Sequence, residues 1–169
     1  MTHELEPLER FRQFVASFLH LPLAAIGLYA ERYTPHDQYA LTVRVPAAEF
    51  EARLHHLGFV RNFVSSLKTR EYHAPAEVSV ASWVHYPEGA FRSSHQLHLA
   101  LYVGPNEEST DIYAHWEPSW IRHPIRHYRA REVDTPTGVA QIRTILSESG
   151  IEYIVKPVAE RYQPKVELP

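Results

Sequence analysis

Apolar positions recur at helical spacing in three parts of the chain. Over Glu6–Leu19 they return every three or four residues, which is typical of an amphipathic helix. A second helix is predicted over Pro46–Gly58, with proline at its first helical position and glycine at its end. A third is predicted over Thr135–Gly150, and we expect Thr135 to be its N-cap because Pro136 follows it.

Other parts of the chain are rich in branched and aromatic residues, or alternate between apolar and polar positions, as strands do. Strands are predicted at Tyr39–Val45, Val64–Tyr72, Glu77–Tyr86, Ser94–Val103, Thr110–Glu117 and Ile151–Val155. Short connections permit only antiparallel neighbours, so the fourth and fifth of these should form a hairpin, with the third strand completing a meander.

Helices interspersed with hairpin-linked strands predict an α+β fold. We expect a single, mostly antiparallel sheet of five to seven strands, with helices packed on one face. At this length one domain is expected, over residues 1–158, with an extended tail at 159–169.

Strand register gives the sharpest prediction of a site. In Ser94–Val103 the leucines mark the core face, so His98 points to the other face. If Pro105–Glu108 is the loop to the next strand, His98 lies directly opposite His115. Opposed Cβ atoms are roughly 4.5–5.5 Å apart, close enough for two imidazoles to share a metal or a proton. Glu117 lies two residues further along the same face.

Further polar and aromatic side chains extend this predicted face. The same register adds Tyr113 to it. Pairing Tyr86 with His95 across the preceding connection would set Trp83 beside His98. The face then carries Trp83, His85, His98, Tyr102, Tyr113, His115 and Glu117.

Imidazoles and a carboxylate together form a suitable ligand set for a divalent metal ion, zinc or iron. The predicted metal ligands are His98, His115 and Glu117. The same three are the candidate catalytic residues, because imidazole titrates near neutrality and can act as acid or base without a metal. The alternative is an ordinary cross-strand pair, since a chain with 12 histidines brings some together by chance.

The segment Trp116–Arg131 alternates basic and aromatic residues. Guanidinium groups bind carboxylates and phosphates through paired hydrogen bonds. We predict that Arg122 and Arg126 bind an acidic group of a ligand, with His123 and His127 beside them. The alternative is a basic surface loop, solvated or docked on an acidic helix of the same chain.

Composition narrows the classes of function. The 169 residues are 44% apolar and 22% charged, which is typical of a folded chain. A net charge of −3 gives no general attraction to nucleic acid or to an anionic membrane, so neither partner is expected. The absence of cysteine excludes thiolate metal sites, and six scattered glycines argue against a nucleotide cofactor. The acidic N-terminus lacks the charge of a secretory signal, so we expect a cytoplasmic protein.

Two classes of function fit these patterns. The first is a histidine-lined, arginine-flanked pocket that binds a metal ion or a small anionic ligand and can be catalytic. The second is a non-enzymatic protein-interaction or homodimerisation module, because aromatic residues beside arginine are enriched at interfaces. Its contact residues would be Tyr113, Trp116, Trp120 and Tyr128.

One stretch of the chain resembles a known family. A strand, a helix ending in Leu57-Gly58-Phe59, and three further strands are similar to one module of the vicinal-oxygen-chelate (glyoxalase-like) proteins. The resemblance implies metal ligands of the His and Glu types on strands, and His98-Leu99-Ala100-Leu101 looks like the opening strand of a second module. The pattern departs from the family after the Thr135–Ser149 helix, where only one further strand fits.

Overall fold

A computed structural model describes residues 33–62, 69–70, 79–104 and 107–157, and the single positions Phe18, Pro22 and Ala25. The helix predicted over Glu6–Leu19, apart from Phe18, lies outside these residues, as does the tail from residue 159. The elements are β1 (Tyr33–Thr34), the 3-10 helix η1 (His36–Gln38), β2 (Tyr39–Val43), α2 (Ala47–His56), β3 (Val60–Arg61), β4 (Thr69–Arg70), β5 (Ala81–His85), β6 (His95–Val103), β7 (Thr110–Pro118), α3 (Pro124–Tyr128) and α4 (Thr135–Glu148).

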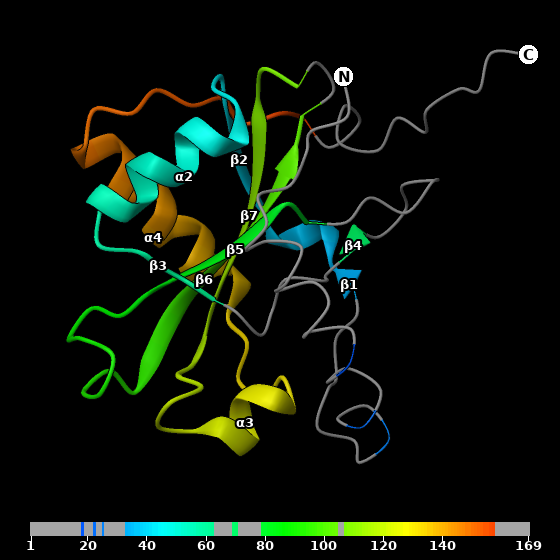
Figure 1. The fold of residues 1–169 in the computed structure, drawn as a ribbon, viewed down its shortest axis with the longest axis vertical. Coiled ribbons are helices and arrows are strands. Elements are labelled where there is room, and N and C mark those ends of the chain that lie inside the picture. The colour runs from blue at the N-terminus through cyan, green and yellow to red at the C-terminus, as the bar shows by residue number, and fades with distance from the viewer. Residues whose placement is uncertain are drawn as a thin grey trace, which may run out of the picture.

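Five of the strands form one antiparallel sheet in the order β2-β7-β6-β5-β3 (Figure 1). This confirms the predicted α+β fold with a single main sheet. The strands β1 and β4 pair separately and in parallel. The predicted strand Ile151–Val155 is reduced to a single bridge, in which Ile154 pairs with Thr42.

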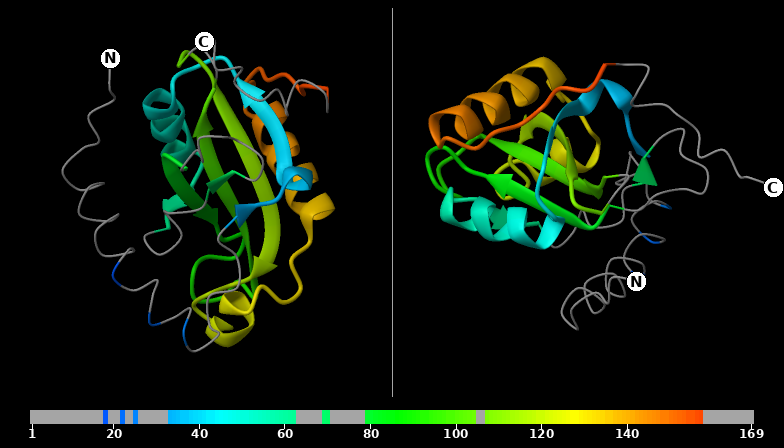
Figure 2. Two further views of the ribbon diagram at one scale, coloured as in Figure 1. Left: turned by 90° about the vertical axis from the view of Figure 1, so that its right-hand side faces the viewer. Right: turned by 90° about the horizontal axis from the view of Figure 1, so that it is seen from above.

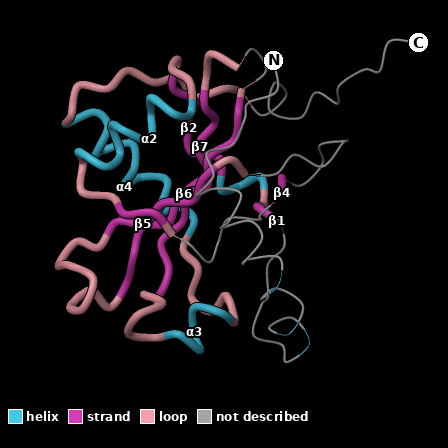
Figure 3. Tube along the Cα trace, viewed as in Figure 1, coloured by secondary structure: helices cyan, strands magenta, loops and turns pink. Residues whose placement is uncertain are grey.

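Side chains from two helices and from the sheet form the hydrophobic core. The inward residues of β6 are Leu97, Leu99 and Leu101, and they pack in one cluster with Phe50 of α2 and Ile142 of α4. Figure 2 shows both helices running alongside the strands. The short helix α3 lies apart from them, near the end of β7 (Figure 3). That the helices cover one face of the sheet stays a prediction.

Both predicted helix starts are displaced by one residue. Pro46 is the N-cap of α2 rather than its first residue. Asp134, not Thr135, caps α4, and its carboxylate accepts a hydrogen bond of 2.9 Å from the main-chain nitrogen of Thr137. A carboxylate at this position satisfies an otherwise unpaired main-chain N–H and interacts favourably with the helix dipole.

The hairpin between β6 and β7 has the predicted register. Gly104 N donates to Ser109 O at 2.7 Å, and Val103 pairs with Thr110. His98 therefore lies opposite His115, as predicted.

The register predicted between β5 and β6 is wrong by one residue. Val84, not Trp83, lies opposite His98. The connecting loop is long and contains its own turn, in which Ser93 N donates to Gly89 O, so its length could not be read from the sequence. A slip of one residue exchanges the two faces of a strand. Trp83 accordingly belongs to the core cluster.

Candidate metal centre

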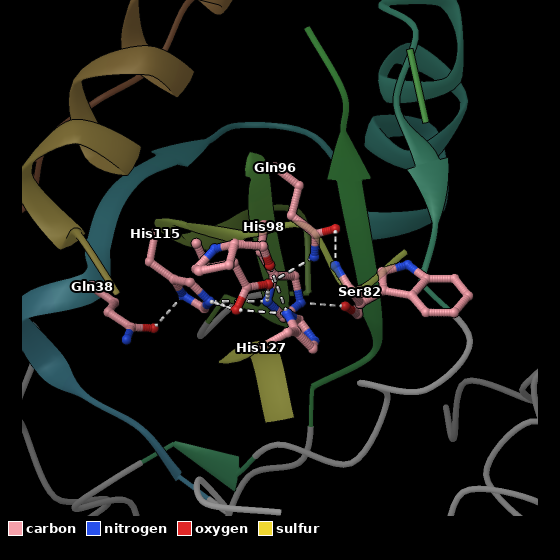
Figure 4. Close-up of polar contacts among 9 residues, drawn as sticks. Gln38, Ser82, Gln96, His98, His115 and His127 are labelled. Atoms are coloured by element: carbon pink, nitrogen blue, oxygen red, sulfur yellow. Dashed lines mark hydrogen bonds and ion pairs between the residues drawn. The ribbon is translucent and has the colours of Figure 1, made fainter. Parts of the chain in front are cut away.

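Three side chains from β6 and β7 converge on the face of the sheet opposite the leucines (Figure 4). His98 Nδ1 lies 3.1 Å from His115 Nε2. Glu117 bridges the two rings, with Oε1 3.2 Å from His98 Nδ1 and Oε2 3.2 Å from His115 Nε2. Among the described residues, these three form the group of potential ligands whose donor atoms all lie within 4.8 Å of one another.

The cluster is buried and electrostatically coupled. His98 is 1% exposed, and His115 and Glu117 are each 4% exposed. Burial by itself would raise the pKa of Glu117, but the imidazoles of His115 and His98 hold that pKa well below its usual value of 4.5. Glu117 is therefore a carboxylate, the protonation state that binds a cation.

In each of the two imidazoles, the nitrogen that points away from Glu117 has a hydrogen-bond partner. His115 Nδ1 lies 2.9 Å from Gln38 Oε1, and His98 Nε2 lies 2.7 Å from Ser82 Oγ. Because Gln38 Oε1 can only accept, His115 carries a proton on Nδ1, and Nε2 is the nitrogen that faces Glu117. Holding the outer nitrogen in this way fixes the ring of a metal-binding histidine and sets its tautomer.

The spacing of the donor atoms fits a bound ion. Ligands about 2.05 Å from a tetrahedral zinc ion are about 3.3 Å from one another, and octahedral ligands at similar bond lengths are about 3.0 Å apart. His98 Nδ1 and His115 Nε2 lie 3.1 Å apart, and each lies 3.2 Å from a different oxygen of Glu117. One donor atom from each residue lies within 4.8 Å of the other two, so the group could hold a metal ion.

Two further side chains hold the carboxylate of Glu117. Gln96 Nε2 donates to Glu117 Oε1 at 2.9 Å, across the register pair that the sequence predicts. His127 of α3 lies with its Nδ1 3.3 Å from Glu117 Oε2. The sequence instead predicts His127 beside Arg122 and Arg126, at the site expected to bind an acidic group.

The remaining predicted residues of this face lie away from the cluster. Tyr102 and Tyr113 share the face, but their rings pack edge to face against each other. The hydroxyl of Tyr102 is engaged by Thr34 at 2.7 Å. Trp83 and His85 lie on the opposite face because of the one-residue shift, where the ring of His85 packs against Phe59.

The two arginines that were predicted to bind an anion make other contacts in the structure. Arg122 donates to the main-chain oxygen of Arg92 at 2.8 Å, and Arg126 pairs with Glu132 at 2.9 Å. His123 is the N-cap residue of α3. Binding of an anion by Arg122, Arg126 and His123 stays a prediction.

The aromatic surface expected for an interaction module is only partly exposed. Tyr113 is 2% exposed, so its assignment to a contact surface is wrong: its ring packs between Tyr39 and Tyr102. Trp116 is partly buried and stacks on the ring of His95. Trp120 is 36% exposed.

Two residues that hydrogen-bond to the cluster were not predicted from the sequence. Gln38 belongs to η1, 77 positions before His115 in the chain. Ser82 would have faced the other way in the predicted register. The correct alternation of β5 would have indicated Ser82, but nothing in the pattern of η1 points to Gln38.

No protein-family model, no curated protein and no solved structure matches this chain. Among the helices that the structure describes, none is long and apolar enough to cross a membrane.

Proposed function

We propose that this chain is a metal-binding protein in which His98, His115 and Glu117 hold one divalent transition-metal ion, zinc or iron. One observation carries the proposal. One donor atom from each of the three residues lies within 4.8 Å of the others, while Gln38 holds the far nitrogen of His115 and Ser82 holds that of His98.

Two neutral imidazoles and one carboxylate are a ligand set found at catalytic zinc and iron centres. Three protein ligands leave at least one coordination position for water or a small anionic ligand. An ion bound there supplies Lewis acidity and lowers the pKa of a coordinated water. The role of Glu117 is to offset part of the charge of the ion, while the two imidazoles set its position.

A second candidate function is acid–base chemistry without a metal. A continuous series of hydrogen bonds links Ser82, His98, His115 and Gln38. Such a series can move a proton between two imidazoles. Ser82, His98 and Glu117 also follow the order of a nucleophilic triad, but Ser82 is 0% exposed, which argues against its attack on a substrate.

Titration of the metal-free protein with Zn²⁺, and with Co²⁺ as a spectroscopic probe, tests the main proposal. We expect one ion per chain, and a loss of affinity of at least about 100-fold in both His115→Gln and Glu117→Gln, because each removes a ligand. The Co²⁺ absorption bands should report nitrogen and oxygen ligands.

The matched control is His95→Gln, which removes an imidazole from the neighbouring strand β6, on the face of the sheet opposite the cluster. It should bind the ion as the wild type does. Failure of the wild type to bind an ion would refute the metal site and leave the metal-free candidate. Equal binding by Glu117→Gln would also refute the site.

A further inference from the structure

A third imidazole reaches the carboxylate from a separate element. His127 of α3 lies with Nδ1 3.3 Å from Glu117 Oε2 and 3.2 Å from the main-chain oxygen of Pro118. Its side chain is 12% exposed, against 6% for that of Glu117. In Figure 4 His127 lies below the cluster, between Gln38 on the left and Ser82 on the right.

The two neighbours of His127 Nδ1 decide what this ring does. Both the carbonyl oxygen of Pro118 and the carboxylate of Glu117 can only accept hydrogen bonds, so Nδ1 must carry a proton. A protonated nitrogen has no lone pair for a metal ion. Nδ1 of His127 therefore donates to Pro118 O and lies beside Glu117 as a proton-bearing nitrogen rather than as a ligand atom.

This donor complements another on the opposite oxygen. Gln96 Nε2 donates to Glu117 Oε1, and His127 Nδ1 lies 3.3 Å from Glu117 Oε2. Gln96 belongs to β6, the middle strand of the sheet, whereas His127 belongs to a helix of five residues. The orientation of the carboxylate consequently depends on where α3 lies.

We propose that His127 is a positioning residue of the metal centre, which orients the carboxylate of Glu117 and so couples the docking of α3 to the affinity for the ion. The inference rests on the proposed function. The main chain supports this coupling, since His127 N donates to His123 O and His123 N donates to Ser119 O, directly after the end of β7. Hydrogen bonds to metal ligands typically change metal affinity by 10–100-fold.

Three substitutions at this position separate positioning from packing. In His127→Asn the side-chain amide nitrogen stands as many bonds from Cα as Nδ1 does, so the donor to Glu117 is kept. In His127→Gln the amide nitrogen lies one bond further away, and in His127→Ala the donor is absent. We expect Zn²⁺ affinity to fall about 10–100-fold in the Ala and Gln variants and to stay within about threefold of wild type in the Asn variant.

The control is Ile125→Ala, an exposed position of the same helix, which should leave the Zn²⁺ affinity unchanged. Urea unfolding of each metal-free variant separates a weakened site from a weakened fold. The ¹⁵N chemical shifts of the His127 ring give an independent test, because they report which nitrogen carries the proton.

The possible outcomes are distinct. Normal Zn²⁺ binding by His127→Ala, or an Nδ1 of His127 that carries no proton, overturns the positioning role and leaves the metal site standing. A loss of binding in the Asn variant equal to that in the Ala variant overturns it as well. An absence of ion binding in the wild type overturns the proposed function itself.

Discussion

At the scale of single residues, the cluster depends on which nitrogen of each ring faces the carboxylate. The rings of His98 and His115 meet edge to face, with centroids 4.7 Å apart and planes at 82°. This geometry directs Nδ1 of one ring and Nε2 of the other toward Glu117. Each ring keeps that orientation because its opposite nitrogen is held by a buried polar side chain.

Gln38→Leu tests this outer support. It removes the acceptor of His115 Nδ1 and leaves a buried N–H without that partner, which costs about 1–3 kcal/mol. We expect a loss of that size in the urea unfolding free energy, and Zn²⁺ affinity lowered about 10–100-fold in calorimetric titrations. The matched control is Ser94→Ala, which removes a hydrogen bond to the exposed end of β6 at His95 and should change stability by less than about 0.5 kcal/mol. Unchanged affinity in Gln38→Leu would contradict the argument.

The sequence predicted the central residues of the cluster and not their support. A four-residue connection and clear alternation determine which residues of β6 and β7 face each other, so His98, His115 and Glu117 could be found by counting. The other contacts are long-range or depend on loop length. Gln38 reaches His115 from a short 3-10 helix whose packing no local pattern encodes. The position of Ser82 depends on the long loop before β6, in which an error of one residue reverses the face.

At the scale of elements, α4 determines where the His115 backbone lies. A Cβ atom on Gly138 would be 2.3 Å from the Cα atom of His115 and 2.6 Å from the nitrogen of Trp116. The absence of a side chain therefore lets the helix pack directly on β7. The bridge between Trp116 and Asp134 holds the start of the same helix against that strand.

Gly138→Ala should therefore destabilise the protein, although alanine is the better helix former by about 1 kcal/mol. The added methyl group must displace backbone atoms, so we expect a net loss of about 1–3 kcal/mol in urea unfolding. Weaker Zn²⁺ binding should accompany it, since the backbone of His115 has to shift. Thr144→Ala, an exposed position of α4, is the control and should stay within about 0.5 kcal/mol of wild type. A more stable Gly138→Ala variant would show that the close approach is absent.

At the scale of the whole molecule, the sheet face opposite the leucines is buried although it is polar. Beyond the cluster, β7 carries Tyr113 and then Asp111, whose carboxylate accepts from Lys156 Nζ at 2.6 Å and from Thr42 at 2.5 Å. Buried charges are costly unless they are paired, and Asp111 has its counter-ion within the chain. Glu117 instead has the imidazoles of His98 and His115 beside it. A bound divalent cation would add positive charge next to this carboxylate.

An ion at this site should therefore stabilise the entire fold. Its ligands lie on β6 and β7, and their supporting residues lie on η1 and β5, so unfolding of the sheet destroys the site. Binding to the native state alone adds about 2.7 kcal/mol at a free ion concentration of 100 times Kd. For a chain of this size that corresponds to a rise in Tm of about 5–10 °C, measured by calorimetry at fixed protein concentration. Mg²⁺ should give a much smaller rise, because it prefers oxygen ligands. In His115→Gln the Zn²⁺-dependent rise should vanish, and an equal rise in that variant would mean that the ion binds elsewhere.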